Sequence, residues 1–420
     1  MILQLFNYNQ LFKHTLLLPN YTETTGFMRH WHKYIEKHKV YDKYAVPHDF
    51  NYGMVVVIPC YDEPDLFTSL NSLCQCIPTQ QPVAVLVVIN SSEMADELVV
   101  LYNRKTYDKL IVFAKEHNTA ELSFHGLLCE SLPRKHAGVG LARKIGMEWA
   151  IRGFLQSKNE DGVILSLDAD CTVSKNYLYS IENKFLTFNP NCCVLNFKHR
   201  VVSNEDSLIN AINQYEQYIR YFRDALKAIG FPYYYHTIGS AFAVSADAYV
   251  RVGGIGRQQG GEDFYFLQKL FQLGKTVELS QTYVYPEARF SERIPFGTGP
   301  ALEKIITSTD GLLRVYSIES FLALKGLLDI KVKFYKQTDE VIIALVEQLH
   351  SSIQVFLNEN KLLSAITDCN KNAASTLTFE KRFFHHFNAF TIIKYLNFAH
   401  DKFFELTPIH KAKDKLNTLL

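Results

Sequence analysis

The feature that most restricts the fold of this chain is a series of short apolar runs, each followed by polar residues. The runs cover residues 54–59, 83–89, 110–113 and 163–167. Apolar runs of this length, without polar alternation, are typical of parallel strands that are buried on both faces. Helical patterns at 65–76 and 138–154 separate them. The sequence therefore predicts an α/β fold with a mainly parallel sheet flanked by helices.

The pattern changes towards both ends, which predicts three segments. Residues 1–50 are polar and aromatic, and we expect a helical N-terminal lead-in there, with a solvated helix over 28–43. Residues 51–300 carry the strand pattern, with further helices predicted at 208–229 and 264–273 and a strand at 242–244. Residues 301–420 are expected to form a helical C-terminal region, with amphipathic helices over 341–357 and 379–406.

Composition excludes several classes of protein. The 420 residues are 47% hydrophobic, which is enough for a sizeable core, and 44 Lys and Arg residues face 43 Asp and Glu residues. With no basic excess, we expect no nucleic-acid partner. The eight cysteines form no Cys-x-x-Cys pair, which argues against a zinc site and suits reduced, buried thiols in a cytoplasmic protein.

The sequence also argues against a membrane-spanning helix. No run of eighteen apolar residues occurs, so no transmembrane segment is expected. Residues 1–18 are a poor signal peptide because polar side chains interrupt them. Any contact with a membrane is expected at its surface only.

The strongest local signal is a pair of carboxylates, Asp168 and Asp170, directly after the strand predicted at 163–167. Ligands of open parallel sheets bind at the carboxyl ends of the strands. A divalent cation, Mg²⁺ or Mn²⁺, suits one or two carboxylates together with substrate phosphates. The alternative for the tripeptide alone is a cap of the strand-to-turn junction, since Asp favours turns.

Other polar residues stand at comparable positions. Arg143 and Lys144 lie near the start of the helix at 138–154, where anions are favoured. Glu262 and Asp263 precede an apolar helix, and a helix-start cap is their simplest alternative role. The candidates that follow strands or precede the 242–244 strand are Pro59, Tyr61, Asp62, Glu63, Asn90, Gly239 and Ser240.

Taken in order, these pieces resemble family-2 glycosyltransferases of the GT-A fold. The matching segments span residues 54–275 and read VVVIPCYDEP, VAVLVVIN, AGVGLARKIGMEWA, VILSLDADC, IGSAFAVSADAYVRVGGI and GGEDFYFLQKLFQLG. The resemblance implies a nucleotide-diphosphate-sugar donor and inversion at the anomeric carbon. It also implies a divalent cation, Mn²⁺ or Mg²⁺.

The resemblance further implies roles for single residues. Asp168 and Asp170 hold the ribose and the metal, with Asp170 the more direct ligand, and Asp263 is the general base for the acceptor hydroxyl, with Glu262 as its alternative. Together with the positions after the strands, this predicts a donor-binding set and an acceptor-binding pair. The donor-binding set is Pro59, Tyr61, Asp62, Glu63, Asn90, Arg143, Asp168, Arg289 and Arg293, and the acceptor-binding pair is Gly239 and Ser240.

The chain departs from the family pattern in three ways. The second strand ends in Asn90-Ser91-Ser92, where family members usually carry acidic residues that bind the nucleobase. The sequence therefore does not predict which nucleobase the donor carries. Lys144 replaces the asparagine that usually follows the helix arginine. The Gln-x-x-Arg-Trp element and the membrane helices of processive members are missing, which favours an enzyme that adds one sugar or a few.

Two other functions are alternatives to sugar transfer. A catalytically silent GT-A domain would bind a nucleotide-sugar or a partner without chemistry, and the intact acidic pairs argue against it. A nucleotidyltransferase would carry a Gly-rich loop with Arg after the first strand, where this chain has CYDEP at 60–64. The donor sugar and the acceptor stay open.

Two segments have competing interpretations. The aromatic cluster before Gly239 packs as helix core or stacks on a substrate; its members are Tyr215, Tyr218, Tyr221, Phe222, Tyr233, Tyr234 and Tyr235. Residues 284–300 carry Arg289 and Arg293 among Gly and Pro residues. They form either an active-site lid whose arginines meet the donor diphosphate or a solvated surface linker.

Overall fold

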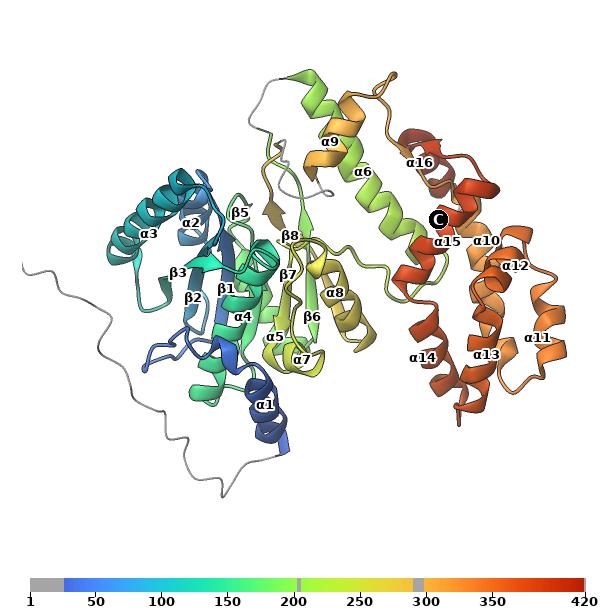
Figure 1. Cartoon of the computed structure of the whole chain (residues 1–420), viewed down its shortest axis with the longest axis horizontal. Coiled ribbons are helices and arrows are strands. Elements are labelled where there is room, and N and C mark those ends of the chain that lie inside the picture. The colour runs from blue at the N-terminus through green and yellow to red at the C-terminus, as the bar shows by residue number, and fades with distance from the viewer. Residues whose placement is uncertain (1–25, 202–204, 290–297, 419–420) are drawn as a thin grey trace, which may run out of the picture.

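The computed structural model describes residues 26–201, 205–289 and 298–418. It consists of a mixed α/β part, built around one large sheet, and a C-terminal part made mainly of helices (Figure 1). Long helix α6 lies between the two parts (Figure 1). The predicted α/β class, with a mainly parallel sheet flanked by helices and a helical C-terminal region, is confirmed.

The central sheet has eight strands in the order β3-β2-β1-β4-β7-β6-β8-β5. Only β7 and β5 run against the others. A two-stranded ribbon, β9 and β10, lies in the C-terminal part. The strands are β1 (Met54–Cys60), β2 (Val83–Ser92), β3 (Leu122–Leu132), β4 (Val163–Ser166), β5 (Thr172–Val173), β6 (Cys192–Phe197), β7 (Phe242–Ser245), β8 (Thr276–Tyr285), β9 (Arg314–Val315) and β10 (Thr407–Pro408).

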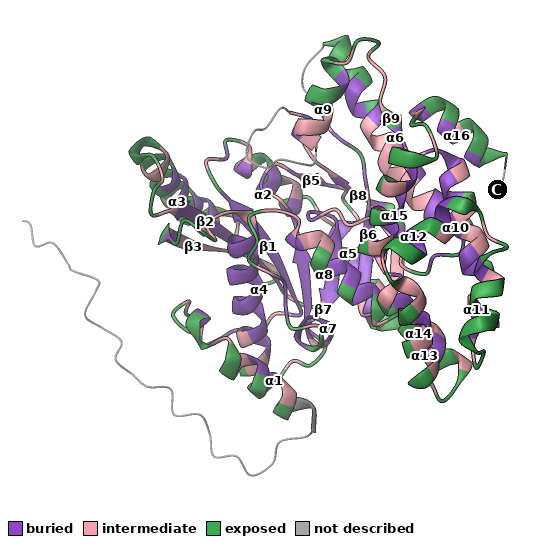
Figure 2. Ribbon diagram, turned by 45° about the vertical axis from the view of Figure 1, so that its right-hand side comes forward, coloured by how far each residue is buried: buried purple, intermediate pink, exposed green. Residues whose placement is uncertain are grey.

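Helices cover both faces of the sheet. One face packs against α1 (Gly26–Lys37), α4 (Val139–Gln156), α7 (Ala246–Arg251) and α8 (Glu262–Gln272). The other face packs against α2 (Leu66–Cys74), α3 (Glu97–His117) and α5 (Tyr177–Phe188). Burial is nearly complete along β1, β2, β4, β6 and β7 (Figure 2). This explains why β1, β2 and β4 read as continuous apolar runs rather than alternating ones.

The C-terminal part forms a core of its own together with α6 (Asp206–Ala228). Its other helices are α9 (Thr298–Ile306), α10 (Ile318–Ile330), α11 (Asp339–Val346), α12 (Ser351–Glu359), α13 (Leu362–Lys371), α14 (Thr376–His386), α15 (Ala389–Lys402) and α16 (Ile409–Asn417). Short 3₁₀ turns occur at Lys39–Tyr41 and Lys331–Phe334. Phe264 of α8 and Tyr234 also pack against this core, so the two parts meet beside the sheet edge.

Sheet register explains why polar residues from distant segments converge. In the antiparallel pair of β4 and β7, Ser166 lies opposite Phe242. The chain leaving β4 towards Asp168 and the chain entering β7 from Ser240 therefore emerge at the same edge. The parallel neighbours β1 and β2 end at that edge too, with Cys60 opposite Ile89.

Helix α4 packs unusually close to the sheet at Gly146. A Cβ atom at this position would lie 2.3 Å from Cγ1 of Val57 on β1, so only glycine allows the approach. The N-cap of the helix is Gly138, whose φ of 147° is in the region that favours glycine. Close packing fixes the depth of α4 and hence the position of Arg143 in its second turn.

The strand predicted at 110–113 is wrong, because these residues lie in helix α3. Leu110 and Phe113 are buried against the sheet, whereas Ile111 and Val112 are exposed, which is helical spacing. The Asp96 side chain accepts from the N–H of Leu98 and caps the helix. Capping and packing thus outweigh the β-branched preference of a four-residue run.

Two other expectations need correction. Helix α1 is not a fully solvated lead-in, because Trp31 and Tyr34 are buried and the Tyr34 hydroxyl bonds Glu148 of α4. The helices expected over 341–357 and 379–406 are each two helices, separated at residues 347–350 and 387–388. Asn388 caps the start of α15, because its side chain accepts from the N–H groups of Phe390 and Thr391, at 3.0 and 3.2 Å.

The eight cysteines are free thiols, most of them buried, as expected. In the part of the chain that the structure describes, no helix is long and apolar enough to cross a membrane.

Candidate active site

A cleft of about 1240 Å³ opens at the carboxyl edge of the sheet. Its walls come from the ends of β1, β2 and β4, the start of α4, the segment before β7, and helices α6, α8 and α15. Twelve predicted site residues line it: Pro59, Tyr61, Glu63, Asn90, Arg143, Asp168, Asp170, Gly239, Ser240, Glu262, Asp263 and Arg289.

Arg143 is the centre of the polar network in the cleft. Its guanidinium is 2% exposed and donates to Asp168 at 2.6 Å and to Glu262. Burial opposes its charge, but the carboxylates of Asp168, Glu262 and Asp263 outweigh burial and raise the pKa of Arg143. A buried arginine with this fork geometry fixes the carboxylates relative to one another.

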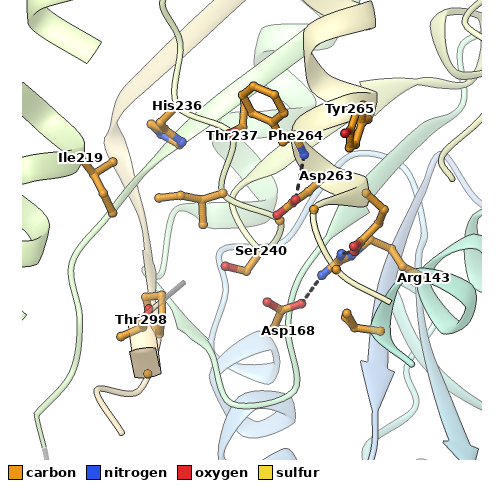
Figure 3. Close-up of a pocket in the computed structure, with 18 of the residues that line it drawn as sticks. Arg143, Asp168, Ile219, His236, Thr237, Ser240, Asp263, Phe264, Tyr265 and Thr298 are labelled. Carbon is orange, nitrogen blue, oxygen red and sulfur yellow. Dashed lines mark hydrogen bonds and ion pairs between the residues drawn. The ribbon is translucent and has the colours of Figure 1, made fainter. Parts of the chain in front are cut away.

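Asp263 lies in the first turn of α8 and faces the cleft near Ser240 (Figure 3). One of its carboxylate oxygens accepts from the N–H of Phe264 at 2.7 Å. Burial raises the pKa of Asp263, and Arg143 acts in the opposite direction. A carboxylate with a raised pKa and access to the cleft is suited to accepting a proton near neutral pH.

Glu262 differs from its neighbour. It is 2% exposed and its carboxylate is held by Arg143. Burial raises the pKa of Glu262, and the ion pair with Arg143 lowers it. Its environment suits a positioning residue for Arg143 more than a group that exchanges protons with a substrate.

Asp168 and Asp170 stand at the floor of the cleft, after β4. Burial and the charges of Asp168 and Glu63 raise the pKa of Asp170 to about 6, against the opposing effect of Arg289. The guanidinium of Arg289 donates to both carboxylate oxygens of Glu63 and lies 3.5 Å from Asp170. Arg289 is therefore a cation of the cleft floor, whereas Arg293 lies outside the described residues.

The charges lining the cleft are unbalanced. Among the lining residues that the structure describes, six carboxylates are set against three guanidiniums; the carboxylates are Glu63, Asp168, Asp170, Glu262, Asp263 and Glu287, and the guanidiniums are Arg143, Arg223 and Arg289. A diphosphate would be repelled from such a surface unless a cation came with it.

The donor set at the cleft floor fits a divalent cation only in part. Among the described residues there is no group of three or more His, Cys, Asp or Glu side chains that could hold a metal ion. Asp168 and Asp170 offer hard oxygen ligands, and Mg²⁺ is commonly bound by one or two carboxylates with substrate phosphates completing the shell. The residues therefore fit a cation that arrives together with a phosphorylated ligand.

Other candidates have supporting contacts. The side chain of Asn90 donates to the carbonyl of Cys60 at 2.9 Å, and Asn103 of α3, which the sequence did not single out, donates to the carbonyl of Asn90 at 3.0 Å. Asn103 also accepts from the N–H of Asp62, which is not among the cleft-lining residues. Lys144 points away from the cleft and donates to the carbonyl of Ile255 at 2.8 Å.

The other half of the cleft is mainly aromatic. From the predicted cluster, Tyr221 is buried in the helical core, and the rings that line the cleft are Tyr215, Tyr218, Phe222, Tyr233, Tyr234 and Tyr235. Core packing is therefore confirmed for Tyr221, and stacking on a substrate stays a prediction for the rings that line the cleft. Sequence reasoning missed Phe264, Tyr265 and Phe390, of which the first two follow Asp263 directly.

His236 lines the same half of the cleft. Its Nε2 donates to the carbonyl of Leu195 at 2.8 Å, and burial lowers the pKa of His236 to about 4. The folded protein thus keeps His236 neutral at pH values where the unfolded chain binds a proton.

Stability should therefore fall as the pH drops from about 6.5 towards 4, by at most about 3 kcal/mol from this group. The contribution of a neutral His236 is complete above the unfolded pKa and is lost as the pH falls towards 4. Urea unfolding of wild type and His236→Gln at pH 7.5, 6 and 4.5 checks this, since the variant should lose less stability on acidification. Parallel losses in both proteins would show that His236 is not responsible.

No protein-family model and no curated protein sequence matches this chain. Among solved structures, it is similar to S. aureus TarS 1-349 in complex with UDP-GlcNAc, at 14% identity and a TM-score of 0.38, over 79% of this chain and 90% of that chain. It is also similar to GalNAc-T7 with UDP, GalNAc and Mn²⁺, at 14% identity and a TM-score of 0.36, over 61% of this chain and 48% of that chain. Similarity at this level does not assign an activity, so the function has to be inferred from the residues of the cleft.

Proposed function

We propose that this protein is an inverting glycosyltransferase that moves a sugar from a nucleotide-diphosphate-sugar to an acceptor hydroxyl. The observation that carries the proposal is the arrangement of two carboxylate sites in one cleft. Asp168 and Asp170 follow β4, Asp263 begins α8, and Ser240 lies between Asp168 and Asp263 in the view of Figure 3. The ordered motifs that resemble family-2 glycosyltransferases support the same function.

Inverting transfer needs a base on the acceptor side and positive charge on the leaving-group side. Asp263 is the base in this proposal, and takes the proton of the acceptor hydroxyl as that oxygen attacks the anomeric carbon. The bond from the anomeric carbon to the diphosphate breaks in the same step. Arg289, beside Asp170, lies where it could stabilise the departing diphosphate.

Asp168 and Asp170 would hold a divalent cation, Mn²⁺ or Mg²⁺, which supplies electrostatic stabilisation of the diphosphate when bound. Arg143 donates one hydrogen bond to Asp168 and another to Glu262, and so holds both carboxylates in place. Donor-side contacts are proposed for Pro59, Tyr61, Glu63 and Asn90, all at the ends of β1 and β2.

Gly239 offers a test of this geometry that leaves every charged group in place. A Cβ atom at this position would lie 2.8 Å from Oδ2 of Asp263 and 3.1 Å from Nη2 of Arg143. Gly239→Ala must therefore displace one of these groups by a few tenths of an ångström. We expect turnover to fall by about 10-fold or more, because small misplacements of reacting groups are costly, with little change in thermal stability.

The matched control is Gly326→Ala in helix α10. A Cβ atom there would meet only Leu349 Cδ2, at the ordinary distance of 3.5 Å. This change should leave turnover as it is and raise the free energy of unfolding by about 0.5–1 kcal/mol, as expected for Gly→Ala inside a helix. Equal turnover in both variants would argue against a close approach of Gly239 to reacting groups.

A donor panel tests the proposed function itself. The full chain is incubated with UDP-, GDP- and dTDP-sugars in the presence of Mn²⁺ or Mg²⁺, and release of the nucleoside diphosphate is measured with calorimetric binding in parallel. We expect one nucleotide class to be bound and slowly turned over in a metal-dependent way. Binding without turnover, with or without candidate acceptors, would favour the silent binding module instead.

A further inference from the structure

We infer that the half of the cleft between α6, α8 and α15 is an acceptor subsite for an uncharged saccharide, to which the C-terminal helical part contributes directly. This inference rests on the proposed function and specifies its substrate class. The carbohydrate-facing wall is defined as Phe264, Tyr265, Gln268, His236 and Phe390, all of which line the cleft.

Aromatic rings on this wall are available to a ligand. Tyr265 and Phe390 stack on each other with centroids 4.6 Å apart, yet they are 48% and 38% exposed. Phe264 meets Phe390 edge-on, with centroids 4.8 Å apart. Large rings that stay partly exposed inside a cleft offer flat apolar faces on which the C–H face of a sugar ring can stack.

Polar groups on the same wall lack protein partners. Gln268 is 5% exposed, and its Oε1 has no hydrogen-bond partner among the described residues. The same holds for Nδ1 of His236, whose Nε2 is already engaged. Leaving such acceptors unpaired costs about 1–3 kcal/mol each. Sugar hydroxyls would satisfy them, whereas an alkyl chain would not.

The electrostatics of this half disfavour an anionic acceptor. Among the described lining residues of α6, α8 and α15, Arg223 is the one with a cationic side chain. Its guanidinium already forms ion pairs with Asp224 and Glu278, at 2.7 and 3.3 Å. Asp263 adds negative charge at the inner end. A neutral ring that combines a flat apolar face with hydroxyls, which is a saccharide, fits these conditions best.

The wall also has the right position relative to the proposed base. Phe264 and Tyr265 follow Asp263 in α8, so a ring stacked on them would present hydroxyls near that carboxylate (Figure 3). Phe390 lies in the first turn of α15, directly after the N-cap Asn388 and next to Phe264 and Tyr265.

Saturation-transfer NMR on the full chain, without donor or nucleotide, tests the inference. The probes are maltose, cellobiose and lactose as neutral saccharides, digalacturonate as an anionic one, and 1-hexanol as an alkyl alcohol, each at millimolar concentration. We expect at least one neutral disaccharide to bind, and Phe390→Ala and Gln268→Leu to weaken it by about 3- to 10-fold. The matched control is Phe403→Ala, since Phe403 is 37% exposed and is not a lining residue of the cleft.

Several outcomes would overturn the inference. These are binding of digalacturonate or hexanol alone, binding of no probe, or unchanged saccharide binding in the variants. If thermal melts show that Phe390→Ala is unfolded, Tyr265→Ala replaces it, and competition among the probes on wild type decides the class. Because no donor is present, failure here is distinct from failure of the donor panel.

Discussion

Replacing Asp263 with Asn is expected to slow sugar transfer by about 10²–10⁴-fold, the usual contribution of a general base. Asn has nearly the same shape and can still accept from the N–H of Phe264, so the start of α8 should stay in place. It cannot take a proton from the acceptor. The affinity for the nucleotide-sugar, measured by calorimetry, should change little because the donor-side residues are on other elements.

The neighbouring change Glu262→Gln is the matched comparison. Glu262 is buried and ion-paired with Arg143, so losing its charge leaves Arg143 with one fewer partner. We expect a loss of stability and of donor affinity rather than a specific loss of the proton-transfer step. Near-normal turnover of Asp263→Asn together with an inactive Glu262→Gln would exchange the two roles.

Replacing Asp170 with Ala is expected to abolish metal-dependent turnover. Burial, together with the charges of Asp168 and Glu63, raises the pKa of Asp170 to about 6, and a divalent cation is the partner that would offset the burial and the repulsion. Because only Asp168 and Asp170 are proposed as ligands among the described residues, Mn²⁺ alone should bind weakly to wild type. It should bind tightly only together with the nucleoside diphosphate, which calorimetry with and without the nucleotide can measure.

The control for this change is Asp161→Ala, which removes an exposed carboxylate at the opposite end of the same strand, β4. It should leave both turnover and Mn²⁺ binding as they are. Excess chelator should abolish turnover by the wild-type protein, as Asp170→Ala does. Full activity in chelator would exclude a metal at the cleft floor and assign the charge stabilisation to Arg143 and Arg289.

The sheet edge could be predicted from sequence because its signal is local. Runs such as 163–167 are buried on both faces, so an Asp after them needs a functional or capping reason. The same reasoning predicted a strand at 110–113, which lies in helix α3. A run of only four apolar residues is compatible with a buried strand and with a helix. Strands β6 and β8 were not predicted at all, although both pair within the large sheet.

The acceptor half could not be predicted in the same way. Phe390 lies more than 120 residues after Tyr265 along the sequence, and only tertiary packing brings their rings together. Gln268 reads as an ordinary polar residue of an amphipathic helix. What marks it is the absence of a partner for its buried Oε1 among the described residues, which is a property of the folded protein.

The most direct test of the central claim is the anomeric configuration of the product. With the donor identified by the panel and a neutral saccharide as acceptor, ¹H NMR of the new linkage is compared with that of the donor sugar. A single displacement assisted by Asp263 predicts a product of opposite configuration to the donor. A product with the donor's configuration, or no product from any nucleotide-sugar that binds, would contradict the account.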